Sequence, residues 1–177
     1  MFLCKEFVNQ KTIMINTENI KMLVLDVDGT MTDGRINVTE EGHQFKQFHA
    51  RDGLGIRMLI KKGIRVGIVS HSFAAGAIQA RGEMLGISHV YTGLDEKDEI
   101  LEKWCKELNL DMSEIAFIGD DLNDIPAMKK VGVSACPANA ADEVINYVDL
   151  VLTKNGGEGC VREFIDKYMT VAYSTIA

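Results

Sequence analysis

Six apolar, β-rich runs recur along the chain, and a stretch with helical character follows nearly every one of them. The runs are almost continuous in hydrophobic residues rather than alternating, which is typical of strands covered on both faces. The pattern predicts strands at 22–27, 65–70, 89–93, 115–120, 131–136 and 149–153, and helices at 53–62, 73–85, 95–108, 122–130, 138–146 and 159–169. Such alternation predicts an α/β fold, a Rossmann-like three-layer parallel sheet with right-handed crossovers.

The segment 34–49 breaks this rhythm. It has the pattern of two short strands around the turn Glu40-Glu41-Gly42, which predicts a β-hairpin inserted after the first strand. The expected organisation is therefore a leader or irregular arm at 1–19, one domain at 20–169 that contains the hairpin, and a tail at 170–177. The leader lacks the apolar core and the cleavage site of a signal peptide, so we expect a cytoplasmic protein.

Composition excludes two classes of protein. The chain carries 19 Lys and Arg against 26 Asp and Glu, a net charge of −7, which argues against a nucleic-acid binder. No apolar run reaches the roughly 20 residues of a membrane span. The four cysteines show no zinc-ligand spacing, so free thiols in a reducing compartment are expected. Trp104, Met128 and Phe164 fall at helical spacing with other apolar residues and are expected in the core.

Polar residues follow the predicted strands at their carboxyl ends, where open α/β sheets bind ligands. The first strand ends in Asp26-Val27-Asp28-Gly29-Thr30, the second in Ser70-His71-Ser72, and the fourth in Gly119-Asp120-Asp121-Leu122-Asn123-Asp124. Lys97 begins the helix that follows the third strand. We therefore expect carboxylates, a hydroxyl and a lysine to meet at one edge of the sheet.

This set of groups suits phosphoryl transfer. Carboxylates so close together raise one another's pKa unless a cation is present, and Mg²⁺ is the cation that such oxygens prefer. A lysine and a hydroxyl directed at the same point suit a phosphoryl group. One carboxylate could attack as a nucleophile, and a second could protonate the leaving alkoxide and then activate water.

The segment DVDGTMTD, then Ser70, Lys97 and GDDLND, resembles in order the four motifs of the haloacid-dehalogenase superfamily of phosphohydrolases. The resemblance covers residues 20–169. It implies that Asp26 is the nucleophile and Asp28 the general acid/base, and that Ser70 and Lys97 bind the phosphoryl group. The resemblance also implies a Mg²⁺ ligand set and further candidate residues, namely Asp120 with the Asp26 carboxylate and the Asp28 carbonyl as ligands, Asp121 and Asp124 to orient the metal-bound waters, and Thr30 and Arg51 for substrate contact.

Within this superfamily the chain looks like small members, without a cap domain, that dephosphorylate 3-deoxy-ulosonic acids, notably 3-deoxy-D-manno-octulosonate 8-phosphate. The segments 32–56, 119–140 and 155–164 carry this narrower likeness. It implies a homotetramer that the hairpin helps to assemble, a neighbouring subunit that covers the active site, and a product that feeds lipopolysaccharide synthesis.

One departure keeps a second substrate open. After the strand-end hydroxyl these phosphatases often have Gly-Arg, whereas this chain has Ser70-His71-Ser72. The alternative substrate is a nine-carbon ulosonic acid 9-phosphate of the sialic-acid type, although the RDG at 51–53 favours the octulosonate group. Arg51 is either a surface charge or a ligand of the substrate carboxylate, and His71 is either a specificity residue or an ordinary packed or solvent-facing histidine.

Other interpretations concern the C-terminal glycines and the class of protein. Gly156, Gly157 and Gly159 either provide turns with positive φ or belong to a lid on a neighbour's site. A phospho-accepting signalling domain would carry its acceptor on a middle strand, whereas Asp26 follows the first strand. A catalytically silent scaffold would have no physical need for the complete set of motifs.

Overall fold

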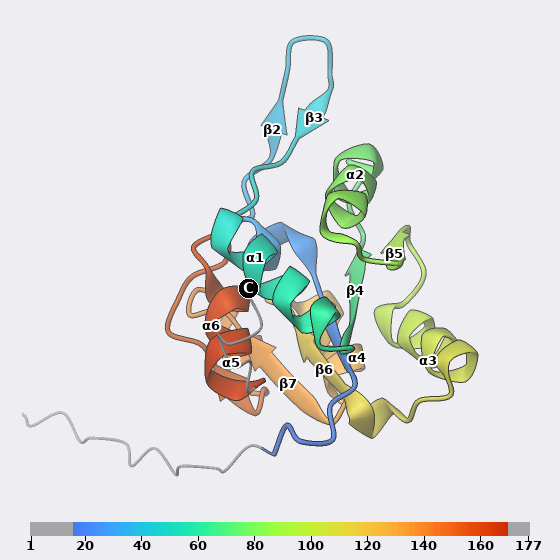
Figure 1. The fold of residues 1–177 in the computed structure, drawn as a ribbon. Coiled ribbons are helices and arrows are strands. Elements are labelled where there is room, and N and C mark those ends of the chain that lie inside the picture. The colour runs from blue at the N-terminus through green and yellow to red at the C-terminus, as the bar shows by residue number, and fades with distance from the viewer. Residues whose placement is uncertain (1–15, 170–177) are drawn as a thin grey trace, which may run out of the picture.

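The computed structural model describes residues 16–169; the first fifteen residues of the expected leader and the expected tail at 170–177 lie outside the described residues. Within this part of the chain, six parallel strands form one sheet in the order β5-β4-β1-β6-β7-β8 (Figure 1). The strands are β1 (Met22–Leu25), β4 (Arg65–Ser70), β5 (His89–Thr92), β6 (Ile115–Ile118), β7 (Val133–Cys136) and β8 (Leu150–Val151). All six coincide with predicted strands, so the α/β parallel-sheet prediction is confirmed.

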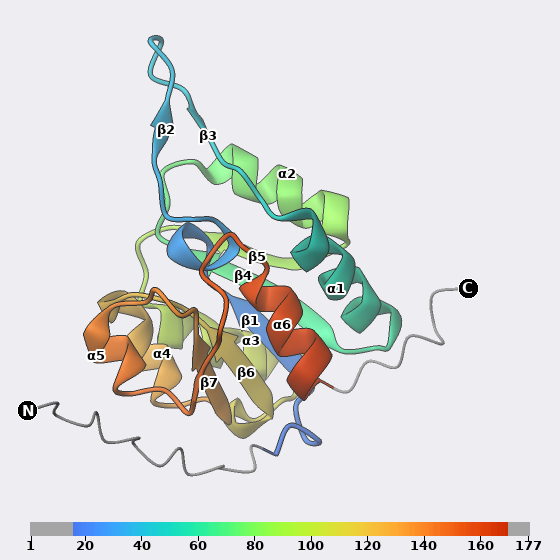
Figure 2. The ribbon, with the colours of Figure 1, turned by 90° about the vertical axis from the view of Figure 1, so that its left-hand side faces the viewer.

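Helices cover both faces of the sheet, which explains why the strands are apolar throughout. One face packs against α1 (Ala50–Lys61), α2 (Ala75–Leu85) and α6 (Cys160–Tyr168), and the other against α3 (Lys97–Leu108), α4 (Ile125–Met128) and α5 (Asp142–Ile145) (Figure 2). Every residue of β1 is fully buried between these layers. The expected core residues Trp104, Met128 and Phe164 are buried as well.

Two predicted helices are shorter than the sequence pattern indicates. The prediction at 122–130 becomes a 3₁₀ turn at Leu122–Asp124 followed by α4, because the side chains of Asp121 and Asp124 cap this turn and Pro126 begins the next helix. The prediction at 138–146 retains only α5, since the loop before it crosses back to the segment around Lys154. Side-chain caps and loop contacts of this kind override helical periodicity locally.

The predicted hairpin projects from the body of the domain (Figures 1 and 2). Its strands β2 (Asn37–Val38) and β3 (Gln44–Phe45) pair antiparallel. The turn lies where it was expected, with Gly42 at a φ of 82°. Because the hairpin stands clear of the sheet, the apolar side chains of Ile36, Val38 and Phe45 remain exposed.

None of the helices in residues 16–169 is long and apolar enough to cross a membrane. Cys105, Cys136 and Cys160 are buried free thiols, as expected for these three, and Cys4 lies outside the described residues.

Candidate active site

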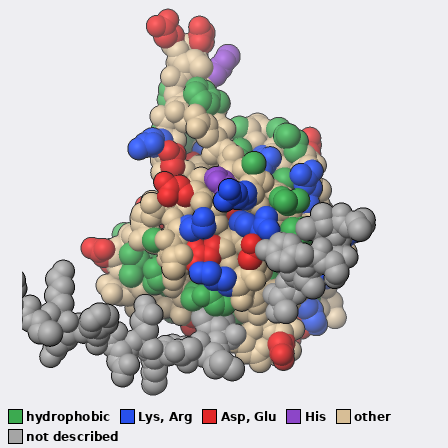
Figure 3. All heavy atoms as spheres, turned by 60° about the vertical axis from the view of Figure 1, so that its left-hand side comes forward, with side chains coloured by type: hydrophobic (Ala, Val, Ile, Leu, Met, Phe, Trp, Pro, Cys, Tyr) green, Lys and Arg blue, Asp and Glu red, His purple; other side chains and the backbone are tan. Residues whose placement is uncertain are grey.

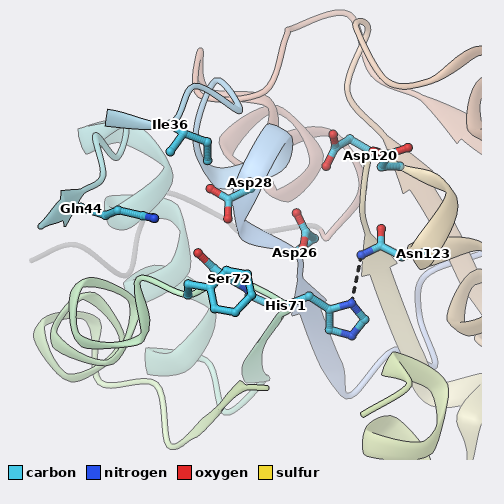
Figure 4. Close-up of a pocket in the computed structure, with 11 residues that line it drawn as sticks. Asp26, Asp28, Ile36, Gln44, His71, Ser72, Asp120 and Asn123 are labelled. Carbon is cyan, nitrogen blue, oxygen red and sulfur yellow. Dashed lines mark hydrogen bonds between the residues drawn. The ribbon is translucent and has the colours of Figure 1, made fainter. Parts of the chain in front are cut away.

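The candidate site lies where the chain reverses its direction along the sheet. From β1 the chain passes to β4 and β5, and it then returns to β6 on the other side of β1. Ligands of open α/β sheets bind at the carboxyl edge beside such a switch point. A cavity of about 360 Å³ opens there, and it is lined by Asp26, Asp28, Ile36, Gln44, Ser70, His71, Ser72, Phe73, Asp120, Asp121 and Asn123 (Figure 4).

A glycine makes the first loop of the site possible. After β1 the backbone turns tightly over Val27–Met31, and Gly29 adopts a φ of 95°, which L side chains rarely adopt. A Cβ atom at Gly29 would lie 1.9 Å from Oδ2 of Asp120. The glycine therefore allows the loop after β1 to approach the acidic loop after β6.

Lys97 connects two of the carboxylates at the centre of the site. Its side chain is only 1% exposed, and its Nζ donates to Oδ1 of Asp26 at 2.6 Å and to Oδ1 of Asp124 at 2.5 Å. The two carboxylates raise the pKa of the lysine above its usual value even though burial opposes this shift. Lys97 thus remains an ammonium, and it joins α3 to the loops after β1 and β6.

Burial has the opposite effect on the acids. It raises the pKa of Asp26 well above its ordinary value, and the charges of Asp124 and Asp120 add to this effect while Lys97 opposes it. Burial, followed by the charge of Asp124, raises the pKa of Asp120 to about 6. These shifts mean that the protein alone does not fully compensate the negative charge of the cluster.

The loop after β6 orients Asp120 from two sides. Oδ2 of Asp124 accepts the backbone N–H groups of Asp120 and Asp121, at 2.9 and 3.2 Å. The hydroxyl of Thr30 donates to Oδ1 of Asp120 at 3.2 Å. Thr30 is fully buried and does not line the cavity, and its hydroxyl positions the Asp120 carboxylate; the expected substrate contact stays a prediction.

The acidic cluster fits a divalent cation. Oxygen atoms of Asp26, Asp120 and Asp124 lie within 4.8 Å of one another. Asp124 already uses both oxygens on Lys97 and on backbone amides, whereas Oδ2 of Asp26 is buried without a hydrogen-bond partner among the described residues. A buried carboxylate oxygen without a partner is costly, and a hard cation such as Mg²⁺ satisfies it. Asp26 and Asp120 are therefore the side chains available to hold the metal.

The hairpin supplies a contact that the sequence did not reveal. Lys46, directly after β3, has a nearly buried side chain whose ammonium pairs with Oδ1 of Asp28. This ion pair joins the hairpin to the carboxylate expected to act as acid and base. A lysine in a polar, exposed strand pattern gives no signal of such a role.

The loop after β4 places its hydroxyl beside the acids. Ser70 is buried at the cavity wall, and its Oγ accepts the backbone N–H of Ser72 at 3.1 Å. The hydroxyl proton thus remains available for donation to a phosphoryl oxygen. The structure therefore brings together Asp26, Asp28, Ser70, Lys97, Asp120 and Asp124, while Asp121 lines the outer wall of the cavity.

Arg51 does not reach this cavity within the chain. It lines a second cavity, of about 570 Å³, together with Lys154, Arg162 and Lys167. Lys and Arg side chains gather on this face, over α1 and α6 (Figure 3). Within the chain Arg51 lies outside the cavity at Asp26, and its expected contact with the substrate carboxylate stays a prediction.

The neighbours of Arg51 have structural roles. Asp52 is buried and accepts the backbone N–H of Arg162 at 2.7 Å, which ties α1 to the first turn of α6. A Cβ atom at Gly53 would lie 2.4 Å from the guanidinium of Arg81. The RDG segment therefore contributes to the packing of α1 against its neighbouring helices.

The glycines before α6 act within the chain. Gly157 and Gly159 have φ values of 71° and 96°, which confirms the expected positive φ at these two positions, whereas Gly156 does not have a positive φ. A Cβ atom at Gly156 would lie 1.7 Å from the carbonyl oxygen of Gly29, so this loop packs directly on the loop after β1. A lid function on a neighbouring subunit stays a prediction.

Comparison with known proteins agrees with this geometry. The model of the haloacid dehalogenase-like hydrolase family matches residues 85–165. The 3-deoxy-D-manno-octulosonate 8-phosphate phosphatase KdsC of Escherichia coli strain K12 is 38% identical over 154 residues, which cover 87% of this chain and 81% of that protein.

Solved structures show the same relationship. The crystal structure of 3-deoxy-D-manno-octulosonate 8-phosphate phosphatase from Yersinia pestis is 38% identical with a TM-score of 0.82, and the match covers 85% of this chain and 80% of that one. The phosphatase from Moraxella catarrhalis, solved in complex with magnesium, phosphate and KDO, is 35% identical with a TM-score of 0.82 and coverages of 85% and 86%. The chain therefore belongs to the haloacid dehalogenase-like hydrolases, in the family of the KdsC phosphatases. It is a phosphoric monoester hydrolase.

Proposed function

We propose that the protein hydrolyses 3-deoxy-D-manno-octulosonate 8-phosphate to the free sugar acid and phosphate, with Mg²⁺ as its cofactor. The observation that carries this proposal is the buried Lys97 between Asp26 and Asp124, with Asp120 within 4.8 Å, at the carboxyl edge of the sheet. The relatives named for this reaction share 38% of the aligned residues. Bound at Asp26 and Asp120, Mg²⁺ would offset the charge of the phosphoryl group as it approaches the acidic cluster.

In the first step a carboxylate oxygen of Asp26 attacks phosphorus, and the bond from phosphorus to the sugar O8 breaks. Asp28 donates its proton to the departing oxygen. The product of this step is an aspartyl-phosphate on Asp26 and the free sugar acid. Lys97 and Ser70 donate to the equatorial phosphoryl oxygens, over which the charge of the transferred group is spread in the transition state.

In the second step Asp28 takes a proton from water, which attacks phosphorus and releases phosphate from Asp26. Lys46 pairs with the Asp28 carboxyl group that takes part in this step. The same pair must loosen for Asp28 to act as an acid in the first step, so the position of the hairpin bears on both.

The alternative substrate is a nine-carbon ulosonic acid 9-phosphate. The observation that favours it is the loop after β4, where His71 and Ser72 line the cavity in place of the Gly-Arg common in octulosonate phosphatases.

We further propose that the cavity is completed in a homotetramer. The cavity lining contains no Lys or Arg, yet a sugar acid carries a carboxylate. Its rim includes the exposed apolar side chains of Ile36, at 60%, and Phe73, at 87%. A neighbouring subunit could cover these side chains and supply a cation. Light scattering should give a tetramer, and a monomer at micromolar concentration would contradict this assembly.

A substrate panel tests the proposed function. Phosphate release is measured from octulosonate 8-phosphate, a nonulosonate 9-phosphate and a generic aryl phosphate, each with Mg²⁺ and with EDTA. The proposal predicts the highest kcat/KM for octulosonate 8-phosphate and no turnover with EDTA. A higher kcat/KM for the nonulosonate would establish the alternative, and no turnover of any ester would overturn the phosphatase proposal.

A further inference from the structure

His71 connects three loops of the site through its two ring nitrogens. Figure 4 shows its contact with Asn123. Its Nε2 lies 2.9 Å from the backbone carbonyl oxygen of Asp95, and its Nδ1 lies 3.3 Å from the side-chain nitrogen of Asn123. A carbonyl only accepts, so Nε2 carries a proton and donates to it, and Nδ1 without a proton accepts from the Asn123 amide. Both hydrogen bonds are thus compatible with one tautomer of the neutral imidazole.

His71 and its two hydrogen-bond partners lie in three loops, and each loop carries a different part of the phosphoryl site. Ser70 directly precedes His71 at the end of β4. Asp95 lies two residues before Lys97, the first residue of α3. Asn123 lies in the turn that begins after Asp120 and ends with Asp124. The imidazole therefore links the loops of the hydroxyl, the lysine and the acidic cluster at one point.

We propose that His71 is a positioning residue that holds Ser70, Lys97 and Asp120 in register for phosphoryl transfer. This inference rests on the proposed function. Phosphoryl-binding groups act most strongly when they are already in place for the transition state, and small displacements reduce the rate. The sequence departure at His71 is then a local reinforcement of the site and not a contact with the sugar.

The effect of positioning falls on kcat for every substrate. His71 acts through groups that bind the phosphoryl moiety, which all phosphomonoesters share. A direct contact between His71 and the sugar would instead raise KM for the sugar phosphate and leave an aryl phosphate unaffected. Comparing the two substrates therefore separates the two roles.

Two conservative variants divide the hydrogen bonds between them. In His71→Asn the side-chain oxygen can take the place of Nδ1 and accept from Asn123, whereas in His71→Gln the side-chain nitrogen can take the place of Nε2 and donate to Asp95. His71→Ala loses both bonds. Loss of one hydrogen bond is worth about fivefold in kcat, and loss of both about tenfold or more.

The expected order of kcat is wild type, then His71→Asn and His71→Gln, then His71→Ala, with similar fold losses for octulosonate 8-phosphate and for the aryl phosphate. Asn123→Ala should lose about fivefold, and the double variant His71→Ala/Asn123→Ala should be no slower than His71→Ala. Leu122→Ala is the matched control, because Leu122 shares the turn with Asn123 but does not line the cavity. It should keep the wild-type kcat.

Three results would overturn the inference: fully additive losses in the double variant, no rescue by either conservative variant, or a loss confined to KM of the sugar phosphate. Nitrogen NMR of the His71 ring tests its two hydrogen bonds, to Asp95 and Asn123, without any substrate. A single Nε2–H tautomer is expected in the wild type. An even mixture of the two tautomers would contradict this pair of hydrogen bonds. If the wild type released no phosphate from any ester, the proposed function would be wrong. The NMR measurement would still show whether His71 makes its two hydrogen bonds.

Discussion

Replacement of Lys97 by methionine should destabilise the metal-free protein strongly, because it leaves two buried carboxylates without their cation. Asp26 and Asp124 are at most 5% exposed, and both pair with Lys97 at 2.6 Å or less. Removing one partner of a buried ion pair costs about 3–5 kcal/mol. Methionine retains most of the apolar stem, so the loss reports on charge more than on packing.

The loss should depend on pH in a defined direction. In Lys97→Met a buried carboxylate without its cation can be neutralised by binding a proton. Keeping that proton costs about 1.4 kcal/mol of stability for each pH unit above an unfolded pKa near 4. Burial raises the folded pKa of Asp26 above its unfolded value, so the penalty is absent below that unfolded pKa and grows as the pH rises. We expect a loss of about 1.4 kcal/mol at pH 5 and the full 3–5 kcal/mol at pH 8.

Urea denaturation at pH 5 and pH 8, with EDTA, measures both values. Lys130→Met is the matched control, because Lys130 also pairs with two carboxylates, of Asp98 and Glu102, at 2.7 Å, but its side chain is 42% exposed. Exposed pairs contribute about 0–1 kcal/mol each. Equal, small losses in the two variants at pH 8 would refute the claim that Lys97 holds an otherwise uncompensated acidic cluster.

Three further predictions follow from the same site. Asp28→Asn should retain the fold and lower kcat by about 10²–10⁴, because asparagine can neither protonate the leaving oxygen nor take a proton from water. Stopped-flow measurement of phosphate release gives this kcat, and an unchanged value would exclude Asp28 as the general acid/base. Mg²⁺ affinity, measured by calorimetry, should fall by at least about tenfold per unit below pH 6, because the metal must displace the proton from Asp120, whose pKa is raised to about 6. A flat profile from pH 7 down to pH 5 would contradict this. Gly29→Ala should abolish activity, because the new Cβ atom would collide with the Asp120 side chain. Gly42 also has a positive φ, but no atom lies within 4 Å of the position that its Cβ would take, so Gly42→Ala should cost about 1 kcal/mol of stability and leave activity intact. Equal effects of the two variants would show that only the backbone conformation matters.

The sequence predicted the sheet and most of the site because both depend on local patterns. Continuous apolar runs identified all six strands, and the chemistry at their carboxyl ends identified Asp26, Ser70, Lys97 and Asp120. Such residues meet in space because parallel strands bring their carboxyl ends to one edge.

Contacts between distant segments could not be predicted in this way. Lys46 lies directly after β3, where the hairpin returns to the body of the domain, and no local sequence pattern relates it to Asp28. Arg51 was predicted near the substrate, yet the direction of α1 places it in the second cavity. Asp124 was expected to orient metal-bound waters, but its contact with Lys97 depends on a 3₁₀ turn that helical periodicity hides.

Phosphate release from octulosonate 8-phosphate by the wild type and by Asp26→Asn, each with Mg²⁺ and with EDTA, tests the central claim most directly. Asparagine preserves the size of the side chain at the end of β1 but cannot serve as the nucleophile. The wild type should release phosphate with Mg²⁺ but not with EDTA, and Asp26→Asn should release none under either condition. Turnover by Asp26→Asn at the wild-type rate, or wild-type turnover in EDTA, would contradict the claim.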